Sequence, residues 1–213
     1  MIWLLDLREV PAGARRAFED GLTPEARERA RRITGSVRRA QFIAGRALLR
    51  HAAARIAGCE LNAVAISEHD RGWPRVEVAG TELPHCSISH SGHWVACAVH
   101  VDTALGLDVE VANGDRDLDG ISERTFSANE REWILSQPDR TLAFYSLWTR
   151  KEAMIKLASA LDEPGTVAGA WHHEQTAAGL ALSVVWAATS GRATTPAVAP
   201  LLRVIHDPSE LLN

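Results

Sequence analysis

The sequence predicts an α+β fold, because groups of short strand patterns alternate with one long helical pattern in each half of its 213 residues. A weak internal repeat supports the same organisation. At a constant offset of 102, Asp6 matches Asp108, Ala26 matches Ala128, Glu28-Arg29 matches Glu130-Arg131, Arg38 matches Arg140 and Phe42 matches Phe144. Such matches also arise by chance, but they fit two similar halves, residues 1–104 and 105–213, that face each other across a pseudo-twofold ligand cleft.

In the first half, residues 2–7 form a strand pattern. Thr23 can cap a helix that has Pro24 at its first position, a favourable start signal. Apolar residues at helical spacing predict a long helix over about 37–57, which Gly58 ends. Short strands follow at 63–67, 75–79, 86–89 and 94–99, with Ser91-Gly92 as the turn before the last of them.

The second half opens with the clearest strand pattern, over residues 105–111. A short helix is expected over 127–136 and a long one over about 139–160, which ends before Pro164-Gly165. Two late strands, near 182–186 and 201–205, complete the prediction.

The composition indicates a globular chain, with 46% hydrophobic and 23% charged residues. A net charge of -4 argues against a general nucleic-acid partner, although eight arginines lie between Arg27 and Arg50. Cys59, Cys86 and Cys97 lack metal-type spacing, and we expect them to be reduced. No stretch approaches the roughly 18 apolar residues of a membrane span, so the prediction is a cytoplasmic protein with no membrane partner.

Two carboxylates mark the strand over 105–111. Asp108 and Glu110 alternate with leucine and valine, so both lie on one face of the strand. Converging carboxylates can bracket a hard cation. The alternative is an edge strand with one solvated face, which produces the same alternation.

A second polar group lies on the long helix, where Trp148, Glu152 and Lys156 follow each other at four-residue intervals. This spacing places them on one helical stripe. Glu152 and Lys156 alone could be a surface pair worth about 0.2–0.5 kcal/mol, but a tryptophan on the same stripe argues against full exposure. If the stripe faces the Asp108 strand, a third carboxylate completes an oxygen site suited to magnesium and phosphate oxygens.

Groups that can bind phosphate occur upstream, in the Arg27 to Arg50 cluster and in residues 87–92 (SISHSG). The alternatives are a solvated arginine-rich face, a structural histidine and an ordinary turn. Nucleic-acid binding is disfavoured, because Phe42 is the one aromatic residue within the basic cluster.

Two motifs, residues 106–110 (GLDVE) and 148–156 (WTRKEAMIK), resemble the signature of the 4'-phosphopantetheinyl transferase superfamily. Residues 87–94 (SISHSGHW) look like a third block of that family, and residues 23–50 are similar to its N-terminal helical region. The length resembles the monomeric, surfactin-synthetase-activator type, which has two pseudo-repeats. The family's fold and a monomeric state are therefore expected.

The resemblance implies that coenzyme A is the substrate and that a serine of an apo acyl or peptidyl carrier protein accepts its 4'-phosphopantetheine group, releasing 3',5'-ADP. It further implies a magnesium ion held by Asp108, Glu110 and Glu152. Glu152 is the candidate general base, and Lys156 stabilises or protonates the leaving group. Glu130 competes as the base, since residues 126–130 resemble a family segment, although Ser127 and Glu130 also form a capping-box pattern.

Contacts to the coenzyme are expected from Arg29, Arg46, Ser89, His90, Lys156 and the turn Gly72-Trp73-Pro74. That turn departs from the Gly-Lys-Pro of related enzymes, because Trp73 brings no charge, though its ring can stack on adenine. The family's basic pair near the 3'-phosphate aligns with Ala26 and Arg29, so one cation is kept. After Lys156, residues 157–160 (LASA) replace a glycine-containing loop.

Two other classes of function remain open from the sequence. One is a magnesium-dependent phosphohydrolase or nucleotidyl transferase that uses the same three carboxylates. The other is a non-catalytic module that binds a carrier protein or a nucleotide.

Overall fold

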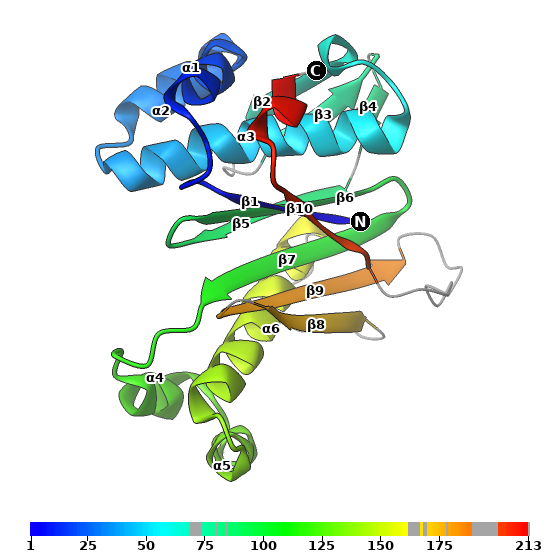
Figure 1. The fold of residues 1–213 in the computed structure, drawn as a ribbon. Helices are drawn as coiled ribbons and strands as arrows, with labels where there is room; N and C mark the ends of the chain where they lie inside the picture. The colour runs from blue at the N-terminus through cyan, green and yellow to red at the C-terminus, as the bar shows by residue number, and fades with distance from the viewer. Residues whose placement is uncertain are drawn as a thin grey trace.

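Two β-sheets packed against each other form the centre of the molecule, and a long helix covers the outer face of each sheet (Figure 1). The structure is a computed structural model, which describes residues 1–68, 74–79, 81–83, 85–161, 167, 170–177, 179–188 and 200–212. The predicted α+β fold is confirmed.

The first half contains β1 (Ile2–Asp6), α1 (Ala12–Asp20), α2 (Pro24–Arg32), α3 (Ser36–Ala57), the 3-10 turn η1 (Leu61–Ala63), β2 (Val64–Glu68), β3 (Pro74–Val78), β4 (Thr81–Leu83), β5 (His85–Ser91) and β6 (Trp94–His100). The second contains β7 (Thr103–Val111), α4 (Leu118–Thr125), α5 (Ala128–Ser136), α6 (Arg140–Ala160), β8 (Trp171–Ala177), β9 (Leu180–Ala188), β10 (Leu202–Ile205) and the 3-10 turn η2 (Pro208–Leu212).

The larger sheet has the strand order β10-β1-β6-β5, and the sheet beneath it has the order β7-β9-β8. A small sheet, β2-β3-β4, lies beside α3. In both central sheets the first strand pairs antiparallel with a later strand, which pairs antiparallel with a third: β1 with β6 and β5, β7 with β9 and β8.

This shared connectivity is what an internal repeat would produce. The last strand, β10, however, returns to pair parallel with β1. The division into 1–104 and 105–213, and the pseudo-twofold axis between them, therefore stay predictions.

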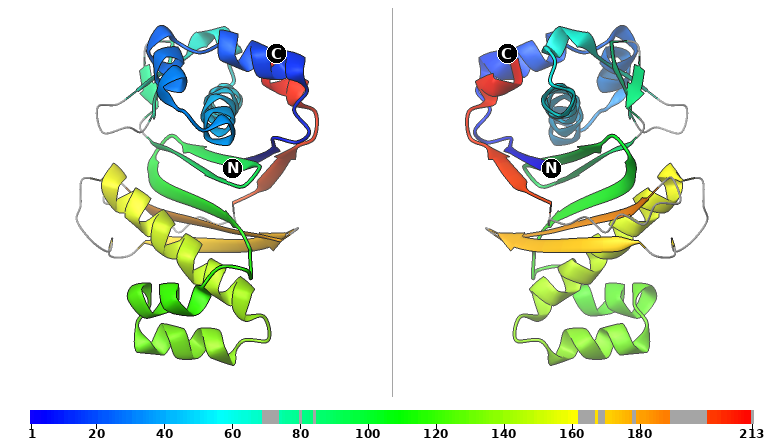
Figure 2. Two further views of the ribbon diagram at one scale, coloured as in Figure 1. Left: turned by 90° about the vertical axis from the view of Figure 1, so that its left-hand side faces the viewer. Right: turned by 90° about the vertical axis from the view of Figure 1, so that its right-hand side faces the viewer.

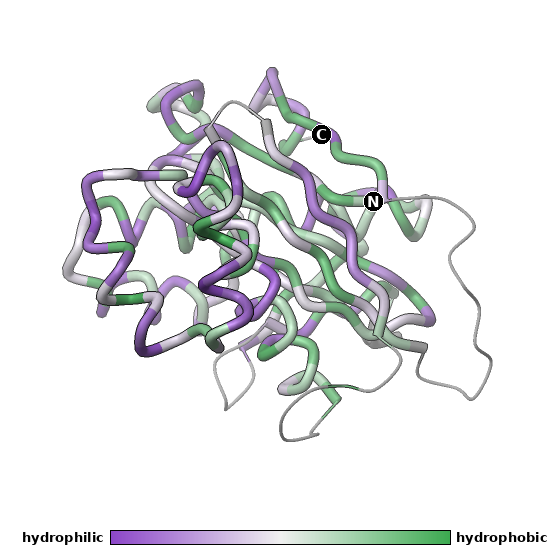
Figure 3. The backbone as a smooth tube through the Cα atoms, turned by 90° about the horizontal axis from the view of Figure 1, so that it is seen from below, coloured by the Kyte–Doolittle hydropathy of each residue, from purple (hydrophilic) through white to green (hydrophobic). Residues whose placement is uncertain are grey.

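Three apolar layers hold the two central sheets and the long helices α3 and α6 together, and a fourth cluster packs α4 and α5 against α6. Side chains of β1 alternate between two of them: Trp3 and Leu5 pack with α3, whereas Ile2 and Leu4 pack between the sheets against Leu107. The third layer lies between the lower sheet and α6. Figure 2 shows α3 and α6 on opposite outer faces of the paired sheets, and Figure 3 shows apolar residues along the central strands.

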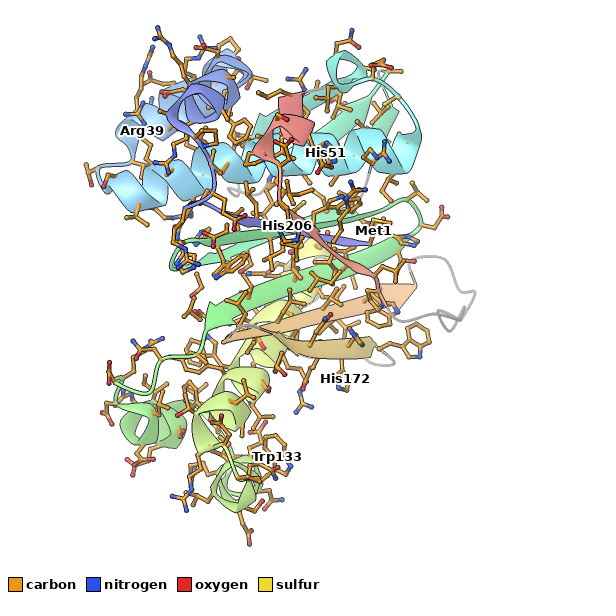
Figure 4. The ribbon with its side chains drawn as sticks, viewed as in Figure 1. Met1, Arg39, His51, Trp133, His172 and His206 are labelled. Carbon is orange, nitrogen blue, oxygen red and sulfur yellow. The ribbon has the colours of Figure 1, made fainter. Side chains whose placement is uncertain are left out.

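Local signals located several elements correctly. The Thr23 hydroxyl accepts a hydrogen bond from the Ala26 amide at the start of α2, and Pro24 is its first residue. Gly58 ends α3 in the left-handed conformation, with φ 65°. The C-terminal turn η2 packs on α3 beside His51 (Figure 4).

Among the described residues, two α-helices and two strands were not predicted, namely α1, α4, β4 and β8, and neither were the 3-10 turns η1 and η2. The residue before α1 is Pro11, which supplies no capping side chain, and the helix buries only Ala14 and Phe18. β8 has the sequence WHHEQTA, whose polar residues hide the strand pattern. Within the described residues, no helix is long and apolar enough to cross a membrane.

Candidate active site

β7 lies unusually close to α6, and Gly106 permits this contact. A Cβ atom on Gly106 would lie 1.9 Å from the Ala153 carbonyl oxygen and 2.6 Å from the Leu157 amide nitrogen, both in the α6 backbone. Any side chain there would push the helix away. Asp108 and Glu110 follow Gly106 at two-residue intervals, so the β7 face that carries them is the face covered by α6.

Lys156 of α6 contacts Asp108 directly. Its Nζ atom donates to Asp108 Oδ1 at 2.7 Å, to the Leu107 carbonyl oxygen at 2.9 Å and to Ser89 Oγ at 3.1 Å. The helical stripe predicted from the sequence therefore does face the Asp108 strand. No ion pair joins Lys156 to Glu152 in the described chain, so the surface-pair alternative is wrong.

Asp108 is 5% exposed, and its two oxygens have different surroundings. Oδ1 accepts from Lys156 and from the Ser89 hydroxyl, the latter at 2.7 Å. Oδ2 is buried and has no hydrogen-bond partner among the described residues. A buried carboxylate oxygen without a partner is costly, which makes Oδ2 a site where a bound cation would be stabilising.

Three serines of β5 connect β7 to the upper sheet. The Ser87 and Ser91 hydroxyls accept hydrogen bonds from the Leu107 and Val111 amides, at 3.0 and 3.1 Å. Ser89, between them, donates to Asp108. The serine hydroxyls thus satisfy backbone groups of β7 that no strand among the described residues pairs on this side. The sequence analysis predicted Ser89 as a coenzyme contact, which stays a prediction, and it did not predict this role of the three serines.

Glu110 is half-buried, and the Ser91 hydroxyl donates to it. Burial raises the pKa of Glu110 above its ordinary value, and the Asp108 carboxylate adds to that rise. Ser91, Arg116 and Lys156 act in the opposite direction and do not compensate fully. The two carboxylates of β7 therefore repel each other, and Lys156 offsets this repulsion only in part.

Glu152 is half-buried on α6 and makes no hydrogen bond or ion pair with the described residues. In the described part of the chain, no three aspartate, glutamate, histidine or cysteine side chains are gathered closely enough to form a metal site. Asp108, Glu110 and Glu152 thus do not form a closed three-ligand set in this structure. Their assignment to one metal stays a prediction.

His90, at the end of β5, lies in a positive field. Burial lowers the pKa of His90 to about 4, and the charges of Arg38 and Lys156 contribute. Arg38 is exposed and makes no hydrogen bond or ion pair with the described residues. A neutral imidazole beside two cations is an arrangement that an anion would stabilise.

A second cationic group lies on α2 and α3, where Arg29 and Arg46 both donate to Glu68 of β2. Both guanidinium groups also lie over the Phe42 ring, at 5.5 and 4.4 Å from its centroid. Although Arg38 is exposed, partial desolvation of its guanidinium lowers the pKa of Arg38, and Arg46 and Arg29 lower it further, so the three arginines share one region. The sequence identified the cluster but not Glu68 as its acidic member.

Glu130 forms the capping box that its spacing from Ser127 indicated. Its carboxylate accepts from the Ser127 amide at 2.8 Å, and the Ser127 hydroxyl accepts from the Glu130 amide. Lys151 lies 3.0 Å from the same carboxylate. Burial raises the pKa of Glu130, but Ser127 and Lys151 outweigh it and hold that pKa below its ordinary value. Glu130 is therefore a weaker base than an ordinary glutamate.

The predicted adenine turn is described only in part. Gly72 and Trp73 lie outside the described residues, and Pro74 begins β3, where its carbonyl oxygen accepts from the Cys86 thiol at 3.5 Å.

Comparison with known proteins points to one family. Residues 104–188 match the model of the 4'-phosphopantetheinyl transferase superfamily. A 4'-phosphopantetheinyl transferase of Bacillus subtilis is 33% identical over 156 residues, which cover 71% of this chain and 66% of the relative. The transferase HetI of Nostoc is 30% identical over 63% of this chain and 58% of its own length.

The transferase Sfp of Bacillus subtilis is 32% identical over 65% of this chain and 61% of its own length. The chain thus spans somewhat less than two thirds of the length of the relatives it matches. The matched region 104–188 contains α6 and all of β7 but its first residue, and with them Asp108, Glu110, Glu152 and Lys156.

Proposed function

The chain belongs to the 4'-phosphopantetheinyl transferase superfamily, and on that premise we propose that it transfers the 4'-phosphopantetheine group of coenzyme A to a carrier-protein serine. The products would be the holo carrier and 3',5'-ADP. The observation that carries the proposal is the junction of Lys156, Asp108 and Ser89, because it joins the three sequence blocks that resemble the family.

A magnesium ion fits the β7 carboxylates. Asp108 Oδ2 is buried without a hydrogen-bond partner from any described residue, and Glu110 has its pKa raised beside Asp108, so both would be stabilised by a hard cation. Asp108 and Glu110 would hold the ion with Glu152 as third ligand. When bound, magnesium would offset the charge of the coenzyme's pyrophosphate and leave positions open for its oxygens.

A test of this assignment is Asp108→Ala, which should abolish carrier modification and weaken magnesium binding while the thermal melting point of the protein changes little. Magnesium binding is read by calorimetry, independently of turnover. A variant that retains near-normal turnover at saturating coenzyme A and magnesium would exclude the Asp108 site.

Lys156 is suited to the leaving group. Phosphoryl transfer to a serine hydroxyl releases 3',5'-ADP, and the oxygen that departs from phosphorus gains negative charge as its bond breaks. The Lys156 ammonium, held beside Asp108, can stabilise that oxygen or donate a proton to it.

We assign the general base to Glu152, whose carboxylate makes no hydrogen bond or ion pair with the described residues. Glu130, in contrast, is occupied by the α5 capping box and by Lys151, and its pKa is lowered. A proton taken from the carrier serine therefore has Glu152 as its better acceptor.

The coenzyme's phosphates would lie toward His90 and the arginines of α2 and α3. Arg29 is the candidate for the 3'-phosphate, with His90 and Arg38 beside it, because a 3'-phosphate requires strong donors outside the metal site. Replacing Arg29 or His90 should weaken coenzyme A binding more than dephospho-coenzyme A binding; equal losses would count against this contact.

Product analysis separates the proposal from the other two classes. The chain is incubated with coenzyme A, magnesium and a purified apo carrier protein, and the carrier is examined by intact mass. A covalent phosphopantetheine adduct supports the transferase. Cleavage of coenzyme A without a carrier supports the phosphohydrolase or nucleotidyl transferase, and binding without turnover supports the non-catalytic module.

The proposed reaction implies two partners, coenzyme A and an apo acyl or peptidyl carrier protein. We further propose that the protein acts as a monomer in the cytoplasm. Cys59, Cys86 and Cys97 form no disulfide with one another, which fits a reducing compartment. A panel of fatty-acid, polyketide and peptide-synthetase carriers assayed by intact mass would identify the acceptor.

A further inference from the structure

We propose that Glu68 is a positioning residue, which together with Arg46 and Phe42 holds the Arg29 guanidinium ready for the 3'-phosphate of the coenzyme. The inference rests on the proposed function and goes beyond it. It assigns a role to Glu68, which the sequence motifs do not contain, and it replaces direct coenzyme contact as the role of Arg46.

The Glu68 carboxylate is shared by two arginines from two helices. Oε1 accepts from Arg46 Nε at 2.7 Å and Oε2 from Arg46 Nη2 at 2.9 Å, a two-point contact. Oε2 also accepts from Arg29 Nη1. Because Glu68 is the last residue of β2, its carboxylate ties α2 to α3 through the small sheet.

The exposure of the three side chains separates their roles. The side chains of Arg46 and Glu68 are 8% and 12% exposed, whereas that of Arg29 is 40% exposed. Arg46 and Glu68 are therefore largely buried, and Arg29 is the more exposed of the two arginines that share the carboxylate. A ligand phosphate would therefore contact Arg29, and Arg46 would position Arg29 through Glu68.

Phe42 supplies the surface on which the two guanidinium groups lie, with the Arg46 carbon at 4.4 Å and the Arg29 carbon at 5.5 Å from the ring centroid. The ring fixes the plane of the guanidinium groups, and the carboxylate fixes their direction. A long arginine side chain held at both points loses less conformational entropy when it binds an anion.

The pairing with Arg46 also explains how a carboxylate is tolerated beside a phosphate site. An unpaired Glu68 would repel the 3'-phosphate, but the two-point contact to Arg46 compensates its charge. The positive charges of Arg46 and Arg29 also act on Arg38, since both lower the pKa of Arg38. The region therefore stays positive despite Glu68.

The test uses the whole chain and two nucleotides that differ in the 3'-phosphate, 3',5'-ADP and 5'-AMP, with binding measured by calorimetry. Glu68→Gln removes the charge but keeps the shape. We expect affinity for 3',5'-ADP to fall by about tenfold or more, the usual effect of a lost charge-assisted contact. Affinity for 5'-AMP should change less than about twofold, since this nucleotide has no 3'-phosphate for Arg29 to meet.

The matched control is Glu28→Gln. Glu28 also pairs with arginines of α2, Arg31 and Arg32, but it is exposed, so its loss should change neither affinity. Arg46→Lys provides a second variant, which keeps the positive charge but not the two-point fork. It should behave like Glu68→Gln, whereas a purely electrostatic role would leave affinity unchanged.

The outcomes separate the inference from the proposed function. A wild-type protein without preference for 3',5'-ADP over 5'-AMP would overturn the coenzyme assignment itself. If the wild-type protein prefers 3',5'-ADP over 5'-AMP and both variants, Glu68→Gln and Arg46→Lys, keep that preference, only the role of Glu68 is overturned. An equal loss of affinity for both nucleotides in these variants would show general structural damage and would also overturn the role of Glu68. Should Glu68→Gln fail to fold, Arg46→Lys decides by the same criterion.

Discussion

Lys156 and Asp108 are 48 positions apart in the chain, and Lys156 Nζ lies 2.7 Å from Asp108 Oδ1. This contact leaves the second oxygen of Asp108 buried and without a hydrogen-bond partner in the part of the chain that the structure describes. One oxygen of the Asp108 carboxylate is thus held by a lysine, and the other is the atom to which we assign the proposed magnesium contact. The lysine fixes the orientation of the carboxylate, so that magnesium and the leaving group would be served by neighbouring side chains.

Lys156→Ala should lower kcat by about 10²-fold or more while coenzyme A binding weakens much less, because a general acid is needed in the transition state. Lys151→Ala is the matched control. Lys151 contacts Glu130 and the Phe126 ring but not Asp108, so its effect should be smaller. A Lys156→Ala enzyme within about threefold of the wild-type kcat would remove Lys156 from the mechanism.

Glu152→Gln and Glu130→Gln distinguish the two candidate bases. We expect Glu152→Gln to lose about 10²-fold or more in kcat, the usual contribution of a general base. Glu130→Gln should act mainly through the α5 cap, so it should resemble Ser127→Ala, which should cost about 1 kcal/mol in the free energy of unfolding. The reverse order of kinetic losses would assign the base to Glu130.

Gly106→Ala should destabilise the protein by about 3 kcal/mol or more, because its Cβ would lie 1.9 Å from the Ala153 oxygen and β7 would have to leave α6. Gly13→Ala in α1 is the control: nothing lies within 4 Å of its Cβ, and alanine favours the helix by about 0.5–1 kcal/mol. Urea unfolding of both variants is the measurement. Wild-type stability in Gly106→Ala would contradict the close packing of the strand on the helix.

His90 should make the folded protein sensitive to acid. Its pKa is about 4 in the fold, against 6.5 as its ordinary value, so between these two pH values the unfolded chain binds more protons. The free energy of unfolding should therefore fall as pH decreases from 6.5 toward 4. His90→Gln should reduce this fall, whereas His172→Gln, at an exposed position on β8, should not. Urea titrations at several pH values decide; equal acid sensitivity in His90→Gln and the wild type would contradict the lowered pKa.

Elements with strong local signals could be predicted from the sequence. Thr23-Pro24 starts α2, Gly58 ends α3 and Ser127 caps α5, each through a contact within a few residues. Elements stabilised mainly by tertiary packing could not. The helix α1 lacks a capping side chain, and the edge strand β8 has a mostly polar sequence, so neither carries a local pattern that distinguishes it from a loop.

The candidate site likewise has features that the sequence pattern predicts and features that only the tertiary structure reveals. The face shared by Asp108 and Glu110 and the stripe shared by Glu152 and Lys156 follow from strand and helix periodicity, and the Lys156 contact confirms that these surfaces meet. The Glu68 contacts could not be predicted, since they join positions 22 and 39 residues apart without periodic spacing. Gly106 was visible as part of a motif, but its steric reason requires the position of α6.

The most direct test of the transferase assignment measures two products in one reaction. Apo carrier, coenzyme A, magnesium and the protein are incubated together, and the modified carrier and the released 3',5'-ADP are quantified side by side. The proposed transfer predicts equal amounts of both, and neither product when the acceptor serine is replaced by alanine. Release of 3',5'-ADP without carrier modification, or modification that persists without the serine, would contradict the assignment.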